Sequence, residues 1–147
     1  MQLELLAAAI LTVVLLTALA AGTDGYIKQQ RKVQLMTAAN MLAEDIRTMQ
    51  QQSIFSDRVL NRQLRVAADS GGYDLYKDRK VVRKIVFSER GCADVYFGKK
   101  ITQVHFTNTG SPSSTGDFEL RHRRLTGYKY IVSIQPVTGR VVVSEGK

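Results

Sequence analysis

The sequence predicts an α+β protein in which one long N-terminal helix packs on a C-terminal antiparallel β-sheet. Three observations predict this class. Residues 1–25 are mostly apolar, residues 26–56 repeat apolar side chains at helical spacing without Pro or Gly, and residues 57–147 alternate at the period of β-strands. We therefore expect three segments: an apolar helix, the amphipathic half of the same helix, and an antiparallel β domain.

The apolar segment is long enough to cross a membrane. Leu5–Ala21 contains only Thr12 and Thr17 as polar side chains, and both can bond back to helix carbonyls. These residues span roughly 26 Å as a helix, and Leu3 and Gly22 extend the run to the ~30 Å of a hydrocarbon core. A secretory signal peptide is the alternative, since "ALAAG" offers a cleavage site, but no basic residue precedes the run.

The segment "GTDGY" predicts a soft spot between two helical halves. Gly22 and Gly25 each weaken a helix by about 1 kcal/mol relative to Ala, and Thr23 or Asp24 can cap a helix that restarts. We expect the helix to bend or melt there, and an ordinary exposed linker is the alternative.

An apolar stripe marks the buried face of the second segment. It consists of Leu35, Ala39, Leu42, Ile46 and Met49, at alternating steps of four and three. We expect Leu35, Leu42, Ile46 and Met49 to form the contact between helix and sheet. The two segments together make a rod of about 50 residues, roughly 75 Å long, which the β domain cannot cover completely. The N-terminal half of the rod must therefore contact lipid or other copies of the chain.

The last segment reads as consecutive short strands separated by turns. The expected strands are 63–68, 72–77, 81–87, 93–97, 102–106, 117–123, 128–135 and 139–145. Turn residues separate them, notably the stretch 108–116 and the Thr-Gly pairs at 126–127 and 138–139. We expect one antiparallel sheet whose apolar face lies on the helix stripe, each buried side chain contributing about 1.5–3 kcal/mol.

Motifs for metal, redox or cofactor chemistry are absent from the sequence. Cys92 is the single cysteine, so no internal disulfide can form. His105 and His122 have no partners at metal-ligand spacing. We therefore expect no metal site and no cofactor.

A membrane-tethered enzyme is the least favoured class of function. Ser53, Ser88 and Asp94 have no base at motif spacing, and the pair Glu44-Asp45 is expected to be solvated charge on a helix face. No catalytic residue is predicted.

The chain resembles type IV pilins and the pseudopilins of type II secretion and DNA uptake. The opening "LELLAAAILTVVLLTALA" is similar to the family's Leu-x-Glu-Leu-Leu start, and Leu42–Ser53 and Gly139–Val143 look most like the GspH/FimT and ComGD group. The resemblance covers nearly the whole chain. It departs at the acidic residue, which is usually fifth in the mature chain and is fourth here.

The resemblance implies an assembly role for Met1 and Glu4. A lone carboxylate in an apolar helix costs about 2.5–3.5 kcal/mol at mid-depth in a bilayer and less near the interface. In this family the chain-terminal amine is N-methylated and keeps its charge, so the amine of Met1 can meet Glu4 of a neighbouring copy. At ~4 Å and an effective dielectric constant of about 20, the attraction is about 4 kcal/mol, and its role is to set register. The alternative is that Glu4 lies among lipid headgroups.

The resemblance also implies a function, a location and partners. The function is a structural subunit that polymerises through its N-terminal helix, in a filament for adhesion, motility, secretion or DNA uptake. The partners are copies of itself or other pilins, the membrane before assembly, an inner-membrane assembly platform, and DNA.

The expected location is the inner or cytoplasmic membrane, followed by an extracellular or periplasmic filament. Lys28, Arg31 and Lys32 follow the apolar run and by themselves would place the C-terminal domain in the cytoplasm. The resemblance implies a mature chain that begins at Met1 after removal of a basic leader, which places Tyr26 onward outside.

The densest group of cations, in "RHRRLTGYK", is a candidate DNA-binding surface. The candidate residues are Arg121, Arg123, Arg124, Lys129 and Arg140, the last two joining if the final strands pair as a meander. Phosphate contacts drive DNA binding, and residues 78–84 are a second, weaker candidate. The alternative is a solvated strand face that protects an edge from aggregation.

This cluster leaves a second class of function open, namely a membrane-anchored DNA receptor of a competence system that does not itself form the filament body. The two classes differ in their dependence on Glu4, which a filament subunit needs and a plain receptor does not.

Overall fold

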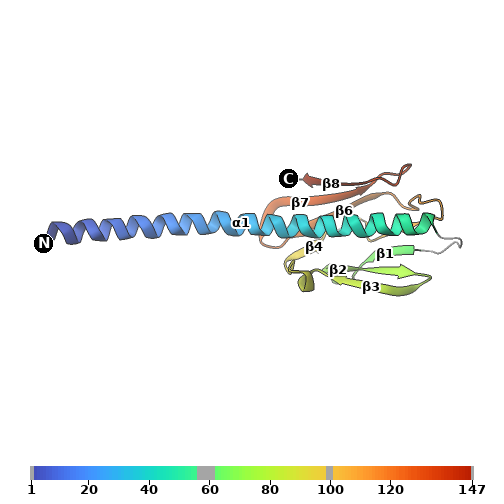
Figure 1. The fold of residues 1–147 in the computed structure, drawn as a ribbon, viewed down its shortest axis with the longest axis horizontal. Coiled ribbons are helices and arrows are strands. Elements are labelled where there is room, and N and C mark those ends of the chain that lie inside the picture. Colours follow the sequence, from blue (N-terminus) through green and yellow to red (C-terminus); the bar gives the residue numbers. More distant parts are fainter. Residues whose placement is uncertain (1, 56–61, 99–100, 147) are drawn as a thin grey trace.

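The structure, a computed structural model, describes residues 2–55, 62–98 and 101–146, with the side chains of all of these except residues 2–7 and 19–21. In the described residues, the long helix α1 (Gln2–Ile54) is followed by eight strands and one short 3-10 helix, η1 (Phe87–Arg90). The strands are β1 (Arg62–Val66), β2 (Gly72–Lys77), β3 (Lys80–Val86), β4 (Val95–Phe97), β5 (Gln103–Phe106), β6 (Gly116–His122), β7 (Leu125–Ile134) and β8 (Val141–Gly146). The predicted α+β class is confirmed, and Figure 1 shows that only the C-terminal half of α1 lies against strands.

Helix α1 is continuous through Gly22 and Gly25, so neither the linker nor a melted turn is seen there. Two glycines cost about 1 kcal/mol each relative to Ala. Good helix formers on both sides carry the helix across them, because each added residue forms another backbone hydrogen bond. A functional division of the chain near residue 25, with a softer helix at this point, stays a prediction.

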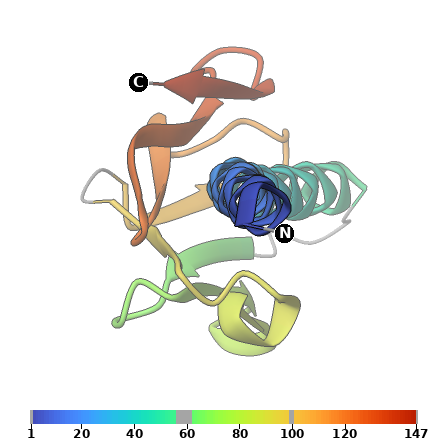
Figure 2. The same cartoon turned by 90° about the vertical axis from the view of Figure 1, so that its left-hand side faces the viewer.

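The strands form two four-stranded antiparallel sheets, so the expectation of one sheet was wrong. The strand orders are β3-β2-β1-β5 and β4-β6-β7-β8. β4 pairs with β6, whereas β5 returns to pair with β1. Turn residues mark where strands end, but they do not determine which strands pair across long stretches of sequence. Viewed along α1, the two sheets curve around one side of the helix (Figure 2).

An aromatic cluster joins the two sheets. Tyr73 of β2 packs on Phe87 and Phe97, with ring centroids 6.0 and 6.2 Å apart, and Phe97 continues to Phe118 of β6 at 6.1 Å. Edge-to-face contacts of this kind each add about 0.5–1.5 kcal/mol beyond the burial of area. The two sheets and the helix therefore share one core.

Two glycines let the loops of the β domain approach the C-terminal end of α1. Gly110 and Gly139 have φ angles of 76° and 63°, the left-handed region that glycine adopts without strain. A Cβ atom on Gly139 would lie 2.3 Å from Nε2 of Gln50, which donates a hydrogen bond to the carbonyl of Gly110 at 3.1 Å. The predicted turns at 108–116 and 138–139 thus hold the end of the helix.

Candidate functional site

The N-terminal half of α1 presents apolar side chains to its surroundings. Every residue from 8 to 18 is exposed, including Leu11 at 65% and Leu16 at 66%. An 18-residue stretch of α1 is long and apolar enough to cross a membrane, and none of that stretch is buried. Thr12 and Thr17 donate hydrogen bonds to the carbonyls of Ala9 and Val14, at 2.8 and 2.9 Å. Both hydroxyls are therefore satisfied inside the helix.

Of the predicted assembly pair, the structure describes only the backbone of Glu4. The backbone of Glu4 belongs to the first turns of α1, while its side chain and all of Met1 lie outside the described part of the chain. The contact between the amine of Met1 and the carboxylate of Glu4 therefore stays a prediction.

The C-terminal half of α1 is covered by the two sheets. Leu35, Leu42 and Ile46 are fully buried and Met49 is 4% exposed. They pack in the same core as Tyr73, Phe118 and Val132 of the two sheets. The structure thus places these four predicted residues between helix and sheets.

A buried polar contact between helix and sheet was missed from the sequence. The hydroxyl of Tyr73 donates to Oδ2 of Asp45 at 2.7 Å, and Nη1 of Arg83 donates to Oδ1 at 3.2 Å. The Asp45 side chain is only 14% exposed, so its description as solvated charge was wrong, while Glu44 is exposed as expected. Burial and the nearby Asp45 carboxylate raise the pKa of Tyr73, which keeps this hydroxyl protonated as a donor.

The signal for this contact was present in the spacing. Asp45 lies three residues after Leu42 and four before Met49, so it borders the apolar stripe. A carboxylate at that border requires a partner from the covering sheet.

The predicted DNA-binding residues are divided by the fold. The carboxylate of the buried Glu119 accepts a hydrogen bond from Nε of Arg121, and Nζ of Lys129 lies 3.9 Å from its other oxygen. Arg124 lies 3.3 Å from Asp94, and Arg123 is exposed. Three of the five cations therefore have acidic partners.

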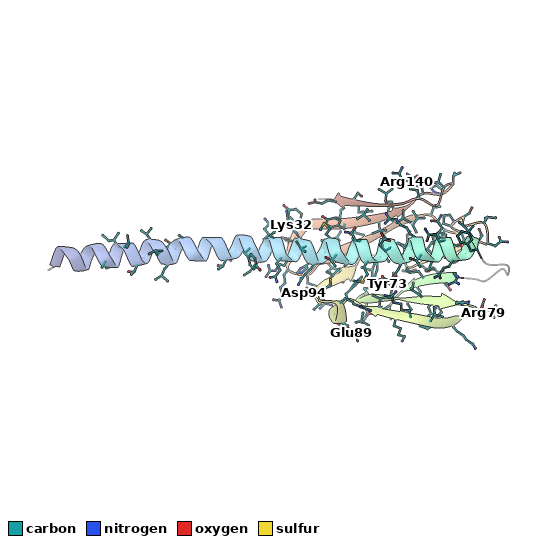
Figure 3. All side chains as sticks on the ribbon, in the orientation of Figure 1. Lys32, Tyr73, Arg79, Glu89, Asp94 and Arg140 are labelled. Carbon is teal, nitrogen blue, oxygen red and sulfur yellow. The ribbon has the colours of Figure 1, made fainter. Side chains whose placement is uncertain are left out.

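Arg140 does not join this cluster. β6, β7 and β8 do pair as a meander, but Lys129 lies opposite Gly146 while Arg140 precedes Val141, the partner of Ile134. About six residues of strand separate the two positions, or roughly 20 Å. Figure 3 shows Arg140 at the end of the domain away from Lys32. The meander forms as predicted, but its register does not bring Arg140 next to Lys129.

Helix α1 contributes cations beside the β6–β7 turn that sequence reasoning did not assign to a site. Nη1 of Arg31 donates to the carbonyl of Arg124 at 3.1 Å. Nζ of Lys32 lies 3.9 Å from the centre of the Tyr128 ring, and Nζ of Lys28 lies 5.6 Å from it. These contacts are cation–π interactions. They join two basic segments that lie about 90 residues apart in the sequence.

His122 is buried directly under this turn. Its Nδ1 accepts a hydrogen bond from the backbone N–H of Arg124 at 3.1 Å, so the proton lies on Nε2, 3.2 Å from Oε1 of Gln34. Burial lowers the pKa of His122, and the charges of Arg31 and Arg124 lower it further, while Asp94 opposes them. The neutral imidazole thus ties the turn to the helix.

Among the described residues, no group of three or more His, Cys, Asp or Glu side chains is arranged to hold a metal ion. Cys92 is buried, its Sγ lies 3.4 Å from the carbonyl of Gln34, and burial raises the pKa of its thiol. The thiol is therefore a packed structural group at neutral pH.

The fold has a counterpart among solved structures. It is similar to the crystal structure of the type IV minor pilin FimU of Pseudomonas aeruginosa (strain PAO1), with a TM-score of 0.62 over 77% of this chain and 90% of that one, at 17% sequence identity. No protein-family model and no curated protein sequence matches the chain. The chain thus has the type IV pilin fold, as the sequence resemblance implied.

Proposed function

We propose that the chain is a structural subunit of a type IV pilus or pseudopilus that polymerises through the N-terminal half of α1. The observation that carries this proposal is the contrast along one helix: residues 8–18 are apolar and exposed, while the stripe from Leu35 to Met49 is buried. Exposed apolar area costs about 25 cal/mol per Å² in water, and patches of this size mark membrane or protein contacts. The pilin fold supports the same role.

The exposed apolar half of α1 contacts lipid before assembly and other subunits after it. Before assembly, the apolar run spans the inner or cytoplasmic membrane, with the β domain outside. During assembly at an inner-membrane platform, the run leaves lipid and packs against the same run of neighbouring subunits. The β domains then form the surface of a periplasmic or extracellular filament.

Glu4 sets the register of this packing. Its carboxylate is the sole acidic side chain before Asp24, and an ion is tolerated in an apolar environment only beside a countercharge. The α-amine of Met1 on an adjoining subunit is the countercharge that the sequence offers. The pair specifies register more than it adds net stability.

The test compares two glutamates of the same helix. In the host cell, the Glu4→Ala variant is expected to remain in the membrane fraction and disappear from sheared filaments, as measured by mass spectrometry of both fractions. Glu44→Ala is the matched control, because Glu44 is exposed on the domain half of α1 and pairs only with Arg47 among the described residues.

Equal amounts of the Glu4→Ala and Glu44→Ala variants in filaments would contradict the proposal. A DNA receptor that does not polymerise predicts instead that neither variant is recovered in filaments, while membrane placement and DNA uptake are the same for both.

A further inference from the structure

Five cations gather on the side of the β domain that faces the apolar half of α1. They are Lys28, Arg31 and Lys32 of the helix, and Arg123 and Arg124 of the β6–β7 turn; we call them the basic collar. Figure 3 shows Lys32 at this end of the domain and Arg79 at the opposite end. Arg123, Arg124 and Lys28 are exposed.

The collar is held as one unit. The contact of Arg31 with the carbonyl of Arg124 fastens the turn to the helix at 3.1 Å. Nζ of Lys32 lies 3.9 Å from the centre of the Tyr128 ring, and Nδ1 of His122 accepts a hydrogen bond from the backbone N–H of Arg124. The backbone of the turn that carries Arg123 and Arg124 is therefore held against α1.

The collar lies just outside the lipid headgroups when the apolar run spans a bilayer. Lys28 and Lys32 follow Gly22 by six and ten residues, which is about 9 and 15 Å of helix. The headgroup layer occupies roughly 5–7 Å beyond the hydrocarbon on each side. Lysine and arginine side chains can extend their charges by several ångströms toward it.

The other charges at this end leave the surface positive. Arg90 and Glu89 of η1 offset each other in charge, Asp94 pairs with Arg124 at 3.3 Å, and Asp24 lies one helical turn before Lys28. The five collar cations therefore face two carboxylates, Asp24 and Asp94. Charges within about 8 Å of an anionic surface are attracted to it at physiological salt.

We propose that the basic collar docks the β domain on anionic phospholipid headgroups while the chain waits in the membrane. The inference rests on the membrane-anchored state of the proposed function. Docking fixes the tilt of α1 and must be released when the subunit enters a filament. Duplex DNA is a weaker fit, because Arg121 and Lys129 are engaged by Glu119 and Arg140 lies at the far end of the domain.

The chain contains no tryptophan, so one introduced tryptophan can report the distance to the bilayer. We would place full-length chain, one copy per lipid nanodisc, in phosphatidylcholine with or without phosphatidylglycerol. Quencher groups would be attached near the headgroups. Thr126→Trp, beside the turn, is expected to be quenched in anionic discs and much less in neutral discs or at 1 M salt.

Two tryptophan controls separate docking from insertion. Val137→Trp, at an 86% exposed site in the β7–β8 loop, is expected to stay unquenched. Val14→Trp, within the apolar run, is expected to be quenched by acyl-chain quenchers in both lipids, which reports insertion independently of docking and of assembly.

Charge variants test the collar itself. Arg123→Gln/Arg124→Gln, in the Thr126→Trp chain, is expected to weaken docking by about fivefold per cation removed. Arg79→Gln/Lys80→Gln removes the same charge from the exposed β2–β3 turn at the far end and is expected to change nothing. Unaltered thermal unfolding shows that both variants are folded.

Absence of lipid-dependent quenching at Thr126→Trp, with Val14→Trp still quenched, would overturn the inference and leave membrane anchoring intact. Equal quenching in neutral and anionic discs would also overturn it. If instead the full chain binds a 30-base-pair duplex and the Arg123/Arg124 variant loses that binding without any change in lipid docking, the collar is a nucleic-acid site.

Discussion

The two halves of α1 belong to one continuous helix but lie in opposite surroundings. From residue 8 to residue 18 every side chain is exposed, although most of them are Leu, Val, Ile and Ala. From Leu35 to Ser53 the apolar face is buried under two sheets. The first half is apolar all around, whereas the second is apolar on one stripe, and this difference determines what each half can contact.

The β domain stabilises only one half of the helix. A half that is apolar on every side cannot be satisfied by a domain on one side, so it requires lipid or several neighbouring helices.

The largest effect is expected from a charge in the exposed half. Leu11→Arg places a guanidinium near the middle of the apolar run, at a cost of about 3 kcal/mol for insertion, so the equilibrium constant for insertion should fall roughly a hundredfold and less chain should be membrane-bound. Met36→Arg, at an exposed position on the domain half, should leave insertion unchanged. Carbonate extraction of membranes measures both variants, and equal retention would show that the run does not span.

A cavity in the covered half is expected to destabilise the domain. Leu42→Ala should lower the free energy of unfolding by about 2–5 kcal/mol, because the side chain is fully buried. Leu16→Ala removes the same atoms from an exposed position and should change it by less than about 0.5 kcal/mol. Urea denaturation of detergent-solubilised chain, followed by circular dichroism, gives both values. Similar values for the two variants would remove the distinction between the halves.

The polar contact across the covered half is expected to contribute less than the core. Tyr73→Phe removes the donor to the mostly buried Asp45 and should cost about 1.5–3 kcal/mol, the range for hydrogen bonds to charged groups. Tyr26→Phe, at an exposed site before the domain, should be neutral. The same denaturation assay distinguishes them, and a neutral Tyr73→Phe would mean that Arg83 alone satisfies Asp45.

The smallest effect is expected from acid. Burial lowers the pKa of His122 below 6.5, so its contribution to stability is complete above pH 6.5 and is lost as pH falls through the lower folded-state value. Protonation of Nδ1 removes the acceptor for Arg124 and adds charge beside Arg31. His122→Asn retains an acceptor without titrating, so the difference in melting temperature between the two chains should shift between pH 7 and pH 5. A pH-independent difference would contradict this assignment.

Much of the fold was predictable because its signals are local. The stripe from Leu35 to Met49 has helical spacing, and each of the eight expected strands overlaps a strand of the structure. Their pairing was not predictable in the same way. The pairing of β4 with β6 in the second sheet, and of β5 with β1 in the first, depends on contacts between segments that are distant in the sequence.

The candidate sites likewise divide into those with local sequence signals and those formed by residues far apart in the sequence. Glu4 stands out because its neighbours are apolar, and the turn cations stand out because they are consecutive. The contact of Arg31 with the turn, and that of Asp45 with Tyr73, join residues far apart in the sequence. In the sequence, Arg31 and Asp45 each look like an ordinary surface charge, because the group that each one contacts lies far away along the chain.

The most direct test of the central claim asks what touches the exposed half of α1 in the host cell. A photo-crosslinking amino acid at Val13, which is 59% exposed, should join the chain to the apolar helix of another subunit, identified by mass spectrometry. The Glu4→Ala background should abolish that product. Crosslinks to lipid alone, unchanged by Glu4→Ala, would contradict assembly through this helix.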